Sequence, residues 1–314
     1  MKSLFILFSA FSFSVYASHV ATVSKLQGKV DLYAPVDLYP QLQGTHVLYQ
    51  SKTYRIVPAE VGTKILNNMI VNTDKKSKAK IVFANGDQIY VTPSSQYEIN
   101  WQEVKGKAKE GPTGINLMYG AIRMMVDKDG PRTGTKVKTR SATFAVRGTD
   151  FHVAQSGSSG VSQVSVLRGK VEASPLSTRS KAKVETVVVE SGKSALTQVG
   201  DATAEVVKTT KQDLKQIALE SKVEMSEKAV PEVVKQEIVQ LEEKARENII
   251  KDIKNADPVL FEEIKTAKIE DLDSLNMKTV ENIYEKAPEA KGKPGWRELD
   301  EIESDPYGKY FKGE

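Results

Sequence analysis

The chain has 314 residues, enough for one large domain or two smaller ones. It contains no cysteine, which excludes disulfides, thiolate catalysis and cysteine-ligated metal sites. The net charge of +4 hides an asymmetry: residues 1–200 hold 26 basic and 14 acidic side chains, a net of +12, and residues 201–314 hold 19 basic and 27 acidic, a net of −8. The two halves are therefore expected to present different surfaces.

The N-terminus has the pattern of a cleaved secretory signal. Lys2 supplies the positive start, residues 4–15 form a short apolar stretch, and Val15-Tyr16-Ala17 offers small side chains where a signal peptidase cleaves. The apolar stretch is well short of the about 20 residues that a membrane-spanning helix needs. We predict a signal peptide at residues 1–17 and a periplasmic or extracellular mature chain without a membrane span. The alternative is an uncleaved anchor or a buried N-terminal helix.

Residues 18–200 are expected to form an all-β domain. Short runs rich in Val, Ile, Thr and Tyr alternate with Gly, Asn, Pro and Ser, which is typical of strands joined by tight turns. Strands are expected at residues 28–33, 79–83, 89–92, 120–126, 161–166, 169–173 and 184–189. Asn85-Gly86-Asp87 predicts a hairpin turn with Gly86 at its centre. Many short strands at this spacing favour a sandwich, a barrel or a solenoid.

A Tyr-rich insertion at about residues 33–58 interrupts this spacing. It holds Tyr33, Tyr39, Tyr49 and Tyr54, four of the eleven tyrosines. If exposed, these rings and Trp101 would form a rigid surface for binding a protein or a sugar. The alternative is that Tyr33 and Tyr54 are ordinary strand residues that pack the insertion onto the domain.

From residue 204 to about residue 290 the apolar period becomes helical. The repeating positions are Val234, Ile238, Leu241, Ala245, Ile249 and Ile253. Pro231 suits the first turn of this helix, Asp257-Pro258 predicts a capped second helix, and residues 274–287 predict a third. Residues 291–314 are expected to be a flexible aromatic and acidic tail. The apolar stripes must be buried on the β domain, on a partner or on another copy, and the opposite charges of the two halves favour the first or the last.

The stretch SATFAVRGTDFHV, at residues 141–153, contains an irregularity in its alternation. Val146 is apolar before Gly148, and the apolar pattern resumes out of step at Phe151. One extra residue at a glycine produces a β-bulge or a sharp corner. Arg147-Gly148-Thr149 is therefore interpreted as a corner with a conformational role, and Gly148→Val is expected to cost about 1–3 kcal/mol.

Seven short motifs follow one another along the β region. They lie at residues 27–30 (QGKV), 61–73, 79–91, 118–122 (MYGAI), 145–151 (AVRGTDF), 166–171 (VLRGKV) and 189–193 (VESGK). In this order they resemble the FecR-type domain of bacterial envelope proteins and iron-dicitrate-sensing regulators. The most specific element, V-R-G-T-x-F, is matched by Val146, Arg147, Gly148, Thr149 and Phe151, and Gly169 occupies the V-x-x-G-x-V that follows. The resemblance covers roughly residues 20–200 and implies an all-β roll of solenoid-like character.

The chain also departs from the regulators of that family. Those proteins carry a cytoplasmic segment that contacts a sigma factor, followed by a membrane span. Here the residues ahead of the β domain have the pattern of a signal peptide, so direct control of a sigma factor is not expected. The Tyr-rich insertion and the helical region also lie outside the family pattern.

Catalysis and metal binding have little support. The three histidines are His19, His46 and His152, scattered and without ligand spacing. His152 lies between Phe151 and Val153 in the alternation and is expected to face solvent. Nucleophile-elbow, zincin and phosphate-binding motifs are absent from the sequence. We expect no catalytic residue, no metal ligand and no cofactor.

The leading function is a non-enzymatic envelope module that binds a protein partner in signalling or envelope organisation, with the helical region as a second contact element. The alternative is a carbohydrate- or peptidoglycan-binding envelope protein, with the tyrosines and the lysines of residues 105–109 on an anionic glycan. A glycan hydrolase is a remote third, because Asp87, Glu98 and Asp150 would have to supply a carboxylate pair in one groove. Nucleic acid is not an expected partner.

Overall fold

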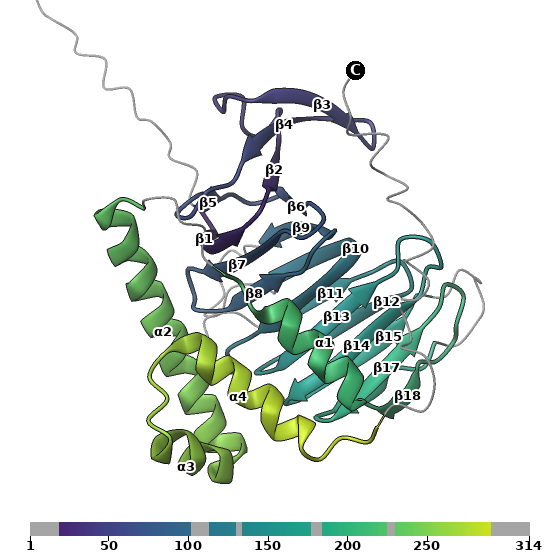
Figure 1. Ribbon diagram of the computed structural model, residues 1–314. Helices are drawn as coiled ribbons and strands as arrows, with labels where there is room; N and C mark the ends of the chain where they lie inside the picture. Colours follow the sequence, from purple (N-terminus) through teal and green to yellow (C-terminus); the bar gives the residue numbers. More distant parts are fainter. Residues whose placement is uncertain (1–18, 102–112, 130–133, 177–183, 225–229, 290–314) are drawn as a thin grey trace, which may run out of the picture.

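The computed structural model describes residues 19–101, 113–129, 134–176, 184–224 and 230–289. Within these ranges the strands come first along the chain and the helices follow, which confirms the predicted fold class (Figure 1). The predicted signal peptide, the predicted tail at 291–314 and the lysines of residues 105–109 lie outside the described residues.

The strands are short, and their bounds are as follows. They are β1 (Ala21–Gln27), β2 (Val30–Pro35), β3 (Thr45–Tyr49), β4 (Lys52–Pro58), β5 (Lys64–Ile65), β6 (Ile70–Thr73), β7 (Lys78–Phe83), β8 (Gln88–Val91), β9 (Gln96–Trp101), β10 (Thr113–Met125), β11 (Thr135–Lys138), β12 (Ala142–Val146), β13 (Asp150–Gln155), β14 (Ser162–Arg168), β15 (Lys170–Pro175), β16 (Val187–Glu190), β17 (Lys193–Thr197) and β18 (Glu205–Lys208).

The strands form two layers, which we name sheet A and sheet B. Sheet A has the order β5-β1-β7-β8-β10-β13-β14-β17-β18. Sheet B has the order β3-β4-β2-β6-β9-β10-β11-β12-β15-β16. Every pair among them is antiparallel except β10–β11. The long strand β10 belongs to both sheets, because its first half pairs in sheet B and its second half, from Gly120 onward, pairs in sheet A.

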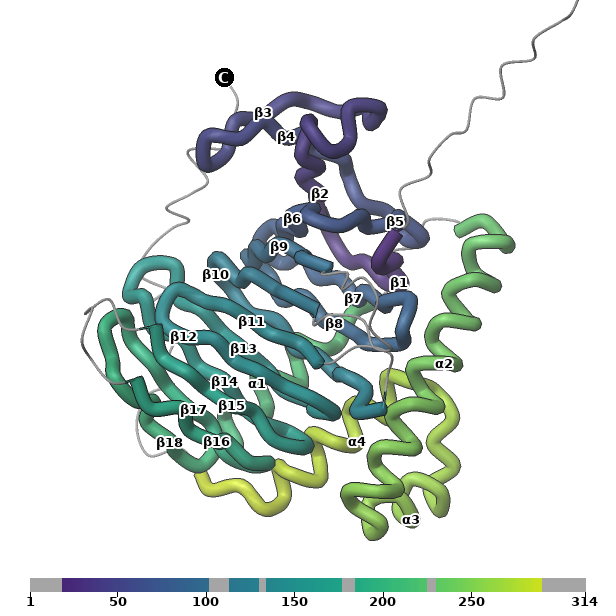
Figure 2. Tube along the Cα trace, turned by 180° about the vertical axis from the view of Figure 1, so that it is seen from behind, coloured from purple at the N-terminus to yellow at the C-terminus, as the bar shows by residue number. Residues whose placement is uncertain are grey.

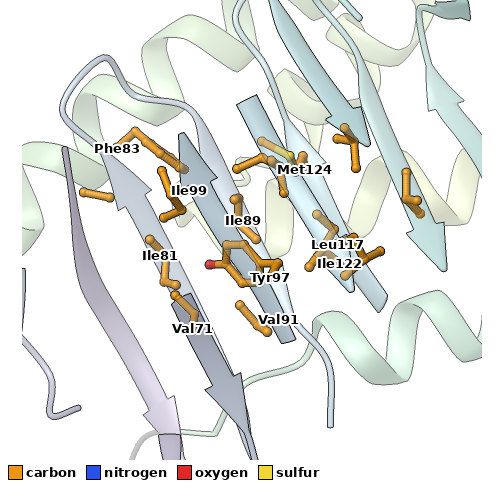
Figure 3. Close-up of a cluster of buried hydrophobic side chains, with 14 of the residues drawn as sticks. Val71, Ile81, Phe83, Ile89, Val91, Tyr97, Ile99, Leu117, Ile122 and Met124 are labelled. Atoms are coloured by element: carbon orange, nitrogen blue, oxygen red, sulfur yellow. The ribbon is translucent and has the colours of Figure 1, made fainter. Parts of the chain in front are cut away.

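The main hydrophobic core fills the space between the two sheets. Figure 3 labels Val71, Ile81, Phe83, Ile89, Val91, Tyr97, Ile99, Leu117, Ile122 and Met124 within it. Alternate residues of each strand point inward, so the remaining residues form an outer face on each sheet. The fold therefore has one core and two outer faces, one on each sheet, and these faces differ in what covers them.

Tyr97 is a polar exception inside this core. Its hydroxyl has no hydrogen-bond partner among the described residues, and burial raises the pKa of its phenol. Removing an unsatisfied buried hydroxyl removes a desolvation cost, so we expect Tyr97→Phe to raise the free energy of unfolding by about 1 kcal/mol. Urea denaturation measures this. The matched control is Tyr90→Phe, which should be destabilising because the Tyr90 hydroxyl donates to Asp273. A Tyr97→Phe variant as destabilised as the control would contradict the assignment.

Four helices follow the strands within the described residues. They are α1 (Lys211–Ser221), α2 (Glu232–Ala256), α3 (Pro258–Thr266) and α4 (Leu272–Tyr284), together called the helical layer. Figure 1 shows them on one side of the roll, and the opposite view in Figure 2 shows strands of sheet B without a helix in front. The predicted helical region thus folds back on its own β domain, one of the alternatives that the sequence left open.

Local chemistry explains where the helices begin. Asp257 caps α3 by accepting from the Leu260 backbone N–H, with Pro258 in the first turn, as predicted from the Asp-Pro pair. Helix α1 lies within the region predicted to be helical but was not placed individually, although Thr210 and Asp213 form a capping box ahead of the apolar Leu214. Strand β18 also lies beyond residue 204, where the sequence indicated only helices.

Candidate functional site

The Arg147-Gly148-Thr149 triplet is the corner at which the chain leaves sheet B and enters sheet A. Strand β12 ends at Val146 in sheet B, and β13 begins at Asp150 in sheet A. Gly148 has a φ of +66°, a left-handed conformation that favours glycine. The buried Thr149 donates its hydroxyl to the carbonyl oxygen of Lys170 at 3.0 Å and exchanges backbone hydrogen bonds with Val126. The corner is therefore hydrogen-bonded to β15 on one side and to the residue that follows β10 on the other.

Two other motif glycines lie at close approaches of the backbone. Gly169 faces this corner, because a Cβ on Gly169 would come within 2.7 Å of the Gly148 carbonyl oxygen. Gly86, in the β7–β8 turn, lies against α2, where a Cβ would come within 2.7 Å of the Asn248 side-chain nitrogen. Gly86 thus combines a turn conformation with room for a helix. Sequence reasoning found the turn and missed the contact with α2.

The outer face of sheet A carries charged residues that the helical layer buries. We call it the covered face, and it includes Lys80, Gln88, Tyr90, Arg123, Asp150 and His152. Arg123 donates from Nε and Nη2 to the two carboxylate oxygens of Asp150 at 2.9 and 2.8 Å. It also donates to the Ser221 hydroxyl at the end of α1 and to the Asn276 carbonyl oxygen in α4. A single buried guanidinium therefore joins sheet A to two helices.

The prediction that His152 faces solvent is wrong. It was expected to face solvent, yet it is 3% exposed, with Nε2 3.1 Å from a carboxylate oxygen of Glu220. The alternation had placed it correctly on the outer face of its strand. That face is buried because α1 lies over it and brings Glu220 to His152, a contact between distant segments that strand alternation does not show.

Lys80 and Tyr90 share a carboxylate from the helical layer. Asp273, in the first turn of α4, accepts from Lys80 Nζ and from the Tyr90 hydroxyl, each at 2.6 Å, and pairs with Lys25. Glu242 of α2 gives Lys80 a second carboxylate at 2.8 Å. The Lys80 side chain is fully buried, so these carboxylates compensate its charge where water cannot.

The pKa of Asp273 makes this contact sensitive to acid. Burial alone would raise that pKa, but the Lys80 charge and the hydrogen bonds from Lys25, Lys80 and Tyr90 lower it from 3.8 to about 2. A folded-state pKa below the unfolded value stabilises the fold at pH above about 4, and the contribution is lost as the pH falls toward about 2.

We therefore expect Asp273→Asn to lower the free energy of unfolding at pH 7 by about 1–2 kcal/mol, a value reduced for the partial exposure of this side chain. The variant should also lose part of the pH dependence between about pH 4 and about pH 2. Urea denaturation at a series of pH values measures both effects. Parallel pH profiles for the natural chain and the variant would contradict this assignment.

The outer face of sheet B is different, because no helix of the described residues lies over it (Figure 2). We call it the open face. Its polar and small members include Asn72, Gln96, Glu98, Asn100, Asn116, Lys136, Lys138, Thr143, Ala145 and Glu172. The same face also carries the apolar Ile70, which pairs with Glu98, and the exposed Val188, which pairs with Glu172. Glu98, Asn116, Lys138 and Thr143 are successive cross-strand neighbours in β9, β10, β11 and β12. They alternate with core residues, so their side chains form one row across the sheet.

Amides and phenols cluster at one end of the open face. Tyr119 donates to the Asn72 side-chain oxygen at 3.0 Å, and Tyr49 donates to the Gln96 side-chain oxygen at 2.9 Å. Asn116 donates to Glu98 at 3.0 Å. The hairpin formed by β3 and β4 extends sheet B at this end. This end therefore combines aromatic rings with hydrogen-bonding groups.

The aromatic residues predicted to bind a partner are mostly packed. Tyr33, Tyr39 and Tyr54 are buried, and Tyr33 and Tyr54 lie in a cluster with Ile70. Trp101 is half-buried and stacks on Phe83 with ring centroids 5.6 Å apart. Their large rings are used to attach the β3–β4 hairpin and to close the core. Tyr33 and Tyr54 pack on the open-face side of sheet B, because Tyr33 pairs with Ile70 and Ile70 with Glu98. Tyr49 is partly exposed there and hydrogen-bonds to Gln96.

The three carboxylates considered for glycan hydrolysis lie in different places. Asp87, in the β7–β8 turn, accepts from the Asp127 backbone N–H, Glu98 lies on the open face, and Asp150 is paired with Arg123. They therefore do not form the facing pair that hydrolysis of a glycoside needs.

Within the described residues there is no group of three or more metal-ligating side chains. Among the described helices, none combines the length and apolar character of a membrane span.

Comparisons with known proteins identify the central part of this roll. The family model described as FecR protein matches residues 69–172, from the start of β6 into β15 and across the 147–149 corner. The motifs at 27–30 and 189–193 lie outside the match. Comparison with curated protein sequences gives no match.

Two crystal structures, both titled "putative anti-sigma factor" from Parabacteroides distasonis ATCC 8503, resemble the chain. Each is 15% identical and covers 48% of this chain, with TM-scores of 0.36 and 0.37. The chain spans 62% and 63% of their lengths, less than two thirds. A likeness of this extent carries no conclusion about function. The family match, in contrast, covers the corner and the strands on both sides of it, so residues 69–172 of this chain match the FecR domain.

Proposed function

We propose that this chain is an exported, non-enzymatic FecR-type module that binds a protein partner of the cell envelope through the open face of sheet B. The FecR match supports a signalling or regulatory role in the envelope. The observation that carries the choice of surface is the asymmetry of the roll. The helical layer buries the outer face of sheet A, whereas the described helices leave that of sheet B uncovered (Figures 1 and 2).

The chemistry of the open face suits a protein interface. Lys136 and Lys138 are exposed on β11, and the acidic Glu172 is exposed on β15 across β12. Charges of both signs on an uncovered sheet, beside half-buried amides and small residues, can orient a partner and set its register. The apolar stripes of the helices, in contrast, are mostly used inside the chain.

We expect charge reversal on the open face to reduce partner recovery. The test is an envelope crosslinking pull-down with the mature chain carrying Lys136→Glu and Lys138→Glu, compared with Lys208→Glu and Lys235→Glu at exposed positions of β18 and α2. The first pair should reduce recovery of the same protein about tenfold, equivalent to about 1.4 kcal/mol of binding free energy. The control pair should leave recovery unchanged. Equal loss in both variants would contradict the assignment.

A carbohydrate ligand is the second candidate, favoured by the amides of Asn72, Gln96 and Asn116 beside Tyr49 and Tyr119. Amides and aromatic edges are groups that can hydrogen-bond and stack on sugars. Incubation of the mature chain with purified peptidoglycan, in the absence of other proteins, separates the two candidates. Retention that a Tyr119→Ala variant loses would favour carbohydrate, and no retention would favour the protein partner.

A further inference from the structure

Charges are divided unequally between sheet A and the helical layer. In the ion pairs Lys25–Asp273, Lys80–Glu242, Lys80–Asp273, Lys64–Glu237 and Arg168–Asp252, the basic residue lies in the sheet and the acidic residue in a helix. The His152–Glu220 contact has the same arrangement. In Lys251–Asp129 the basic residue is on α2 and the acidic residue lies beyond the end of β10, and both side chains are exposed. The sheet therefore presents cations to a ligand that presents carboxylates, and here that ligand is the chain's own C-terminal region.

The covered face also carries more buried charged side chains than a permanently buried interface needs for stability. A buried ion pair is often no more stabilising than apolar residues of similar volume, because each charge must be removed from water. Lys80 is fully buried, and both of its carboxylate partners lie on helices. Arg123, in contrast, has its carboxylate partner Asp150 in the same sheet. The cations of this face would be well solvated if the helices were absent.

The helical layer has much of its apolar core within itself. Ala245, Ile249, Ile253, Leu260, Ile264, Leu272 and Leu275 come from α2, α3 and α4 and form one cluster. The residues that sheet A adds to this cluster are Val82, Tyr90 and Met125. A second cluster joins Leu167 of β14 to α1 and α4. Contact between the layers thus depends on a few apolar side chains and on ion pairs, a combination suited to reversible docking.

We propose that the covered face of sheet A is a docking surface for an acidic amphipathic helix of a partner protein. In this structure α4, together with α2, occupies that surface. The partner helix would present one carboxylate to Lys80, Lys25 and Tyr90, as Asp273 does, and an apolar residue to Met125 and Val82. Helix binding by a complementary face follows this general pattern. The partner would displace the chain's own helices, so binding at this face would be coupled to their release.

The test uses the full chain and a fluorescent peptide of residues 257–287, which contains α3 and α4, as the acidic helix. Asp273→Lys with Glu242→Lys should release the chain's own helices, because both new cations face Lys80. Fluorescence anisotropy should then show at least tenfold tighter peptide binding to this variant than to the natural chain. Binding should weaken as salt is raised, and a peptide carrying Asp273→Lys should bind at least tenfold more weakly.

Two further measurements keep the proposal falsifiable if the released variant does not fold. In the natural chain, amides of α2 and α4 should exchange with solvent at least tenfold faster than those of β13 and β14. Added salt should widen this difference. Equal exchange rates would overturn the proposal, as would equal peptide affinity for the natural and released chains. Dimerisation of the released variant without peptide would also overturn it, since the occupant would then be a second copy of the chain.

Discussion

Replacing Arg123 by Ala is expected to lower the free energy of unfolding by about 3–5 kcal/mol, because it leaves a buried carboxylate without its partner. Arg123 is 1% exposed and makes a two-point contact with Asp150, which is itself buried. Burial alone would lower the pKa of the Arg123 guanidinium, but the Asp150 carboxylate more than offsets this and the net pKa is raised. The loss also removes the contacts to Ser221 and Asn276, so the helical layer should loosen as well.

The control for Arg123→Ala separates the unpaired charge from the lost packing. Arg123→Met combined with Asp150→Leu removes both charges and keeps most of the side-chain volume. Such exchanges are often close to neutral in buried ion pairs, so the double variant should recover most of the loss. Urea denaturation followed by circular dichroism measures both variants. A single variant that loses less than about 1 kcal/mol, the scale of an exposed ion pair, would contradict the assignment.

Gly148→Val is expected to lower the free energy of unfolding by about 2–4 kcal/mol, more than the sequence alone indicated. Its φ of +66° is strained for a β-branched residue. In addition, a Cβ at this position would contact the Lys128 side chain and lie 3.0 Å from its Cα. The corner cannot move away easily, because Thr149 is tied to Val126 and Lys170. Thermal denaturation measures the loss.

Gly200→Val is the matched control for the corner. Gly200 has a φ of +96°, and a Cβ there meets nothing within 4 Å. It should therefore show the cost of backbone strain alone, and Gly148→Val should exceed it by at least about 1 kcal/mol. If the two substitutions were equally costly, the close approach at Lys128 would have no energetic consequence.

Features determined by local chemistry could be predicted from the sequence. The Asn85-Gly86-Asp87 turn, the strand alternation and the Asp257 cap depend on a few neighbouring residues, and the structure contains each of them. The mainly β fold followed by helices could be predicted for the same reason. Helix α1 is short, and although its Thr210–Asp213 capping box is visible in the sequence, the few apolar positions after it were not recognised as a period.

Features that depend on distant contacts could not be predicted. Asp150 lies inside the FecR motif, but its partner Arg123 is 27 residues earlier in the chain. His152 was placed on the right side of its strand, and its burial depends on a helix about 70 residues later. Tyr33 and Tyr54 were left open between a binding role and packing, and only their contact with Ile70 shows that they pack. Alternation identifies a face, whereas the tertiary fold decides what covers it.

The most direct test of the central claim compares the open face of sheet B with the solvent side of the helical layer by photocrosslinking in the cell envelope. A photoreactive residue replaces Lys138, on the open face, or Glu247, on the solvent side of α2. We predict that position 138 forms an adduct with a specific envelope protein and that position 247 does not. An adduct from position 247 without one from position 138 would contradict the account, because the helical layer, and not sheet B, would then be the binding surface.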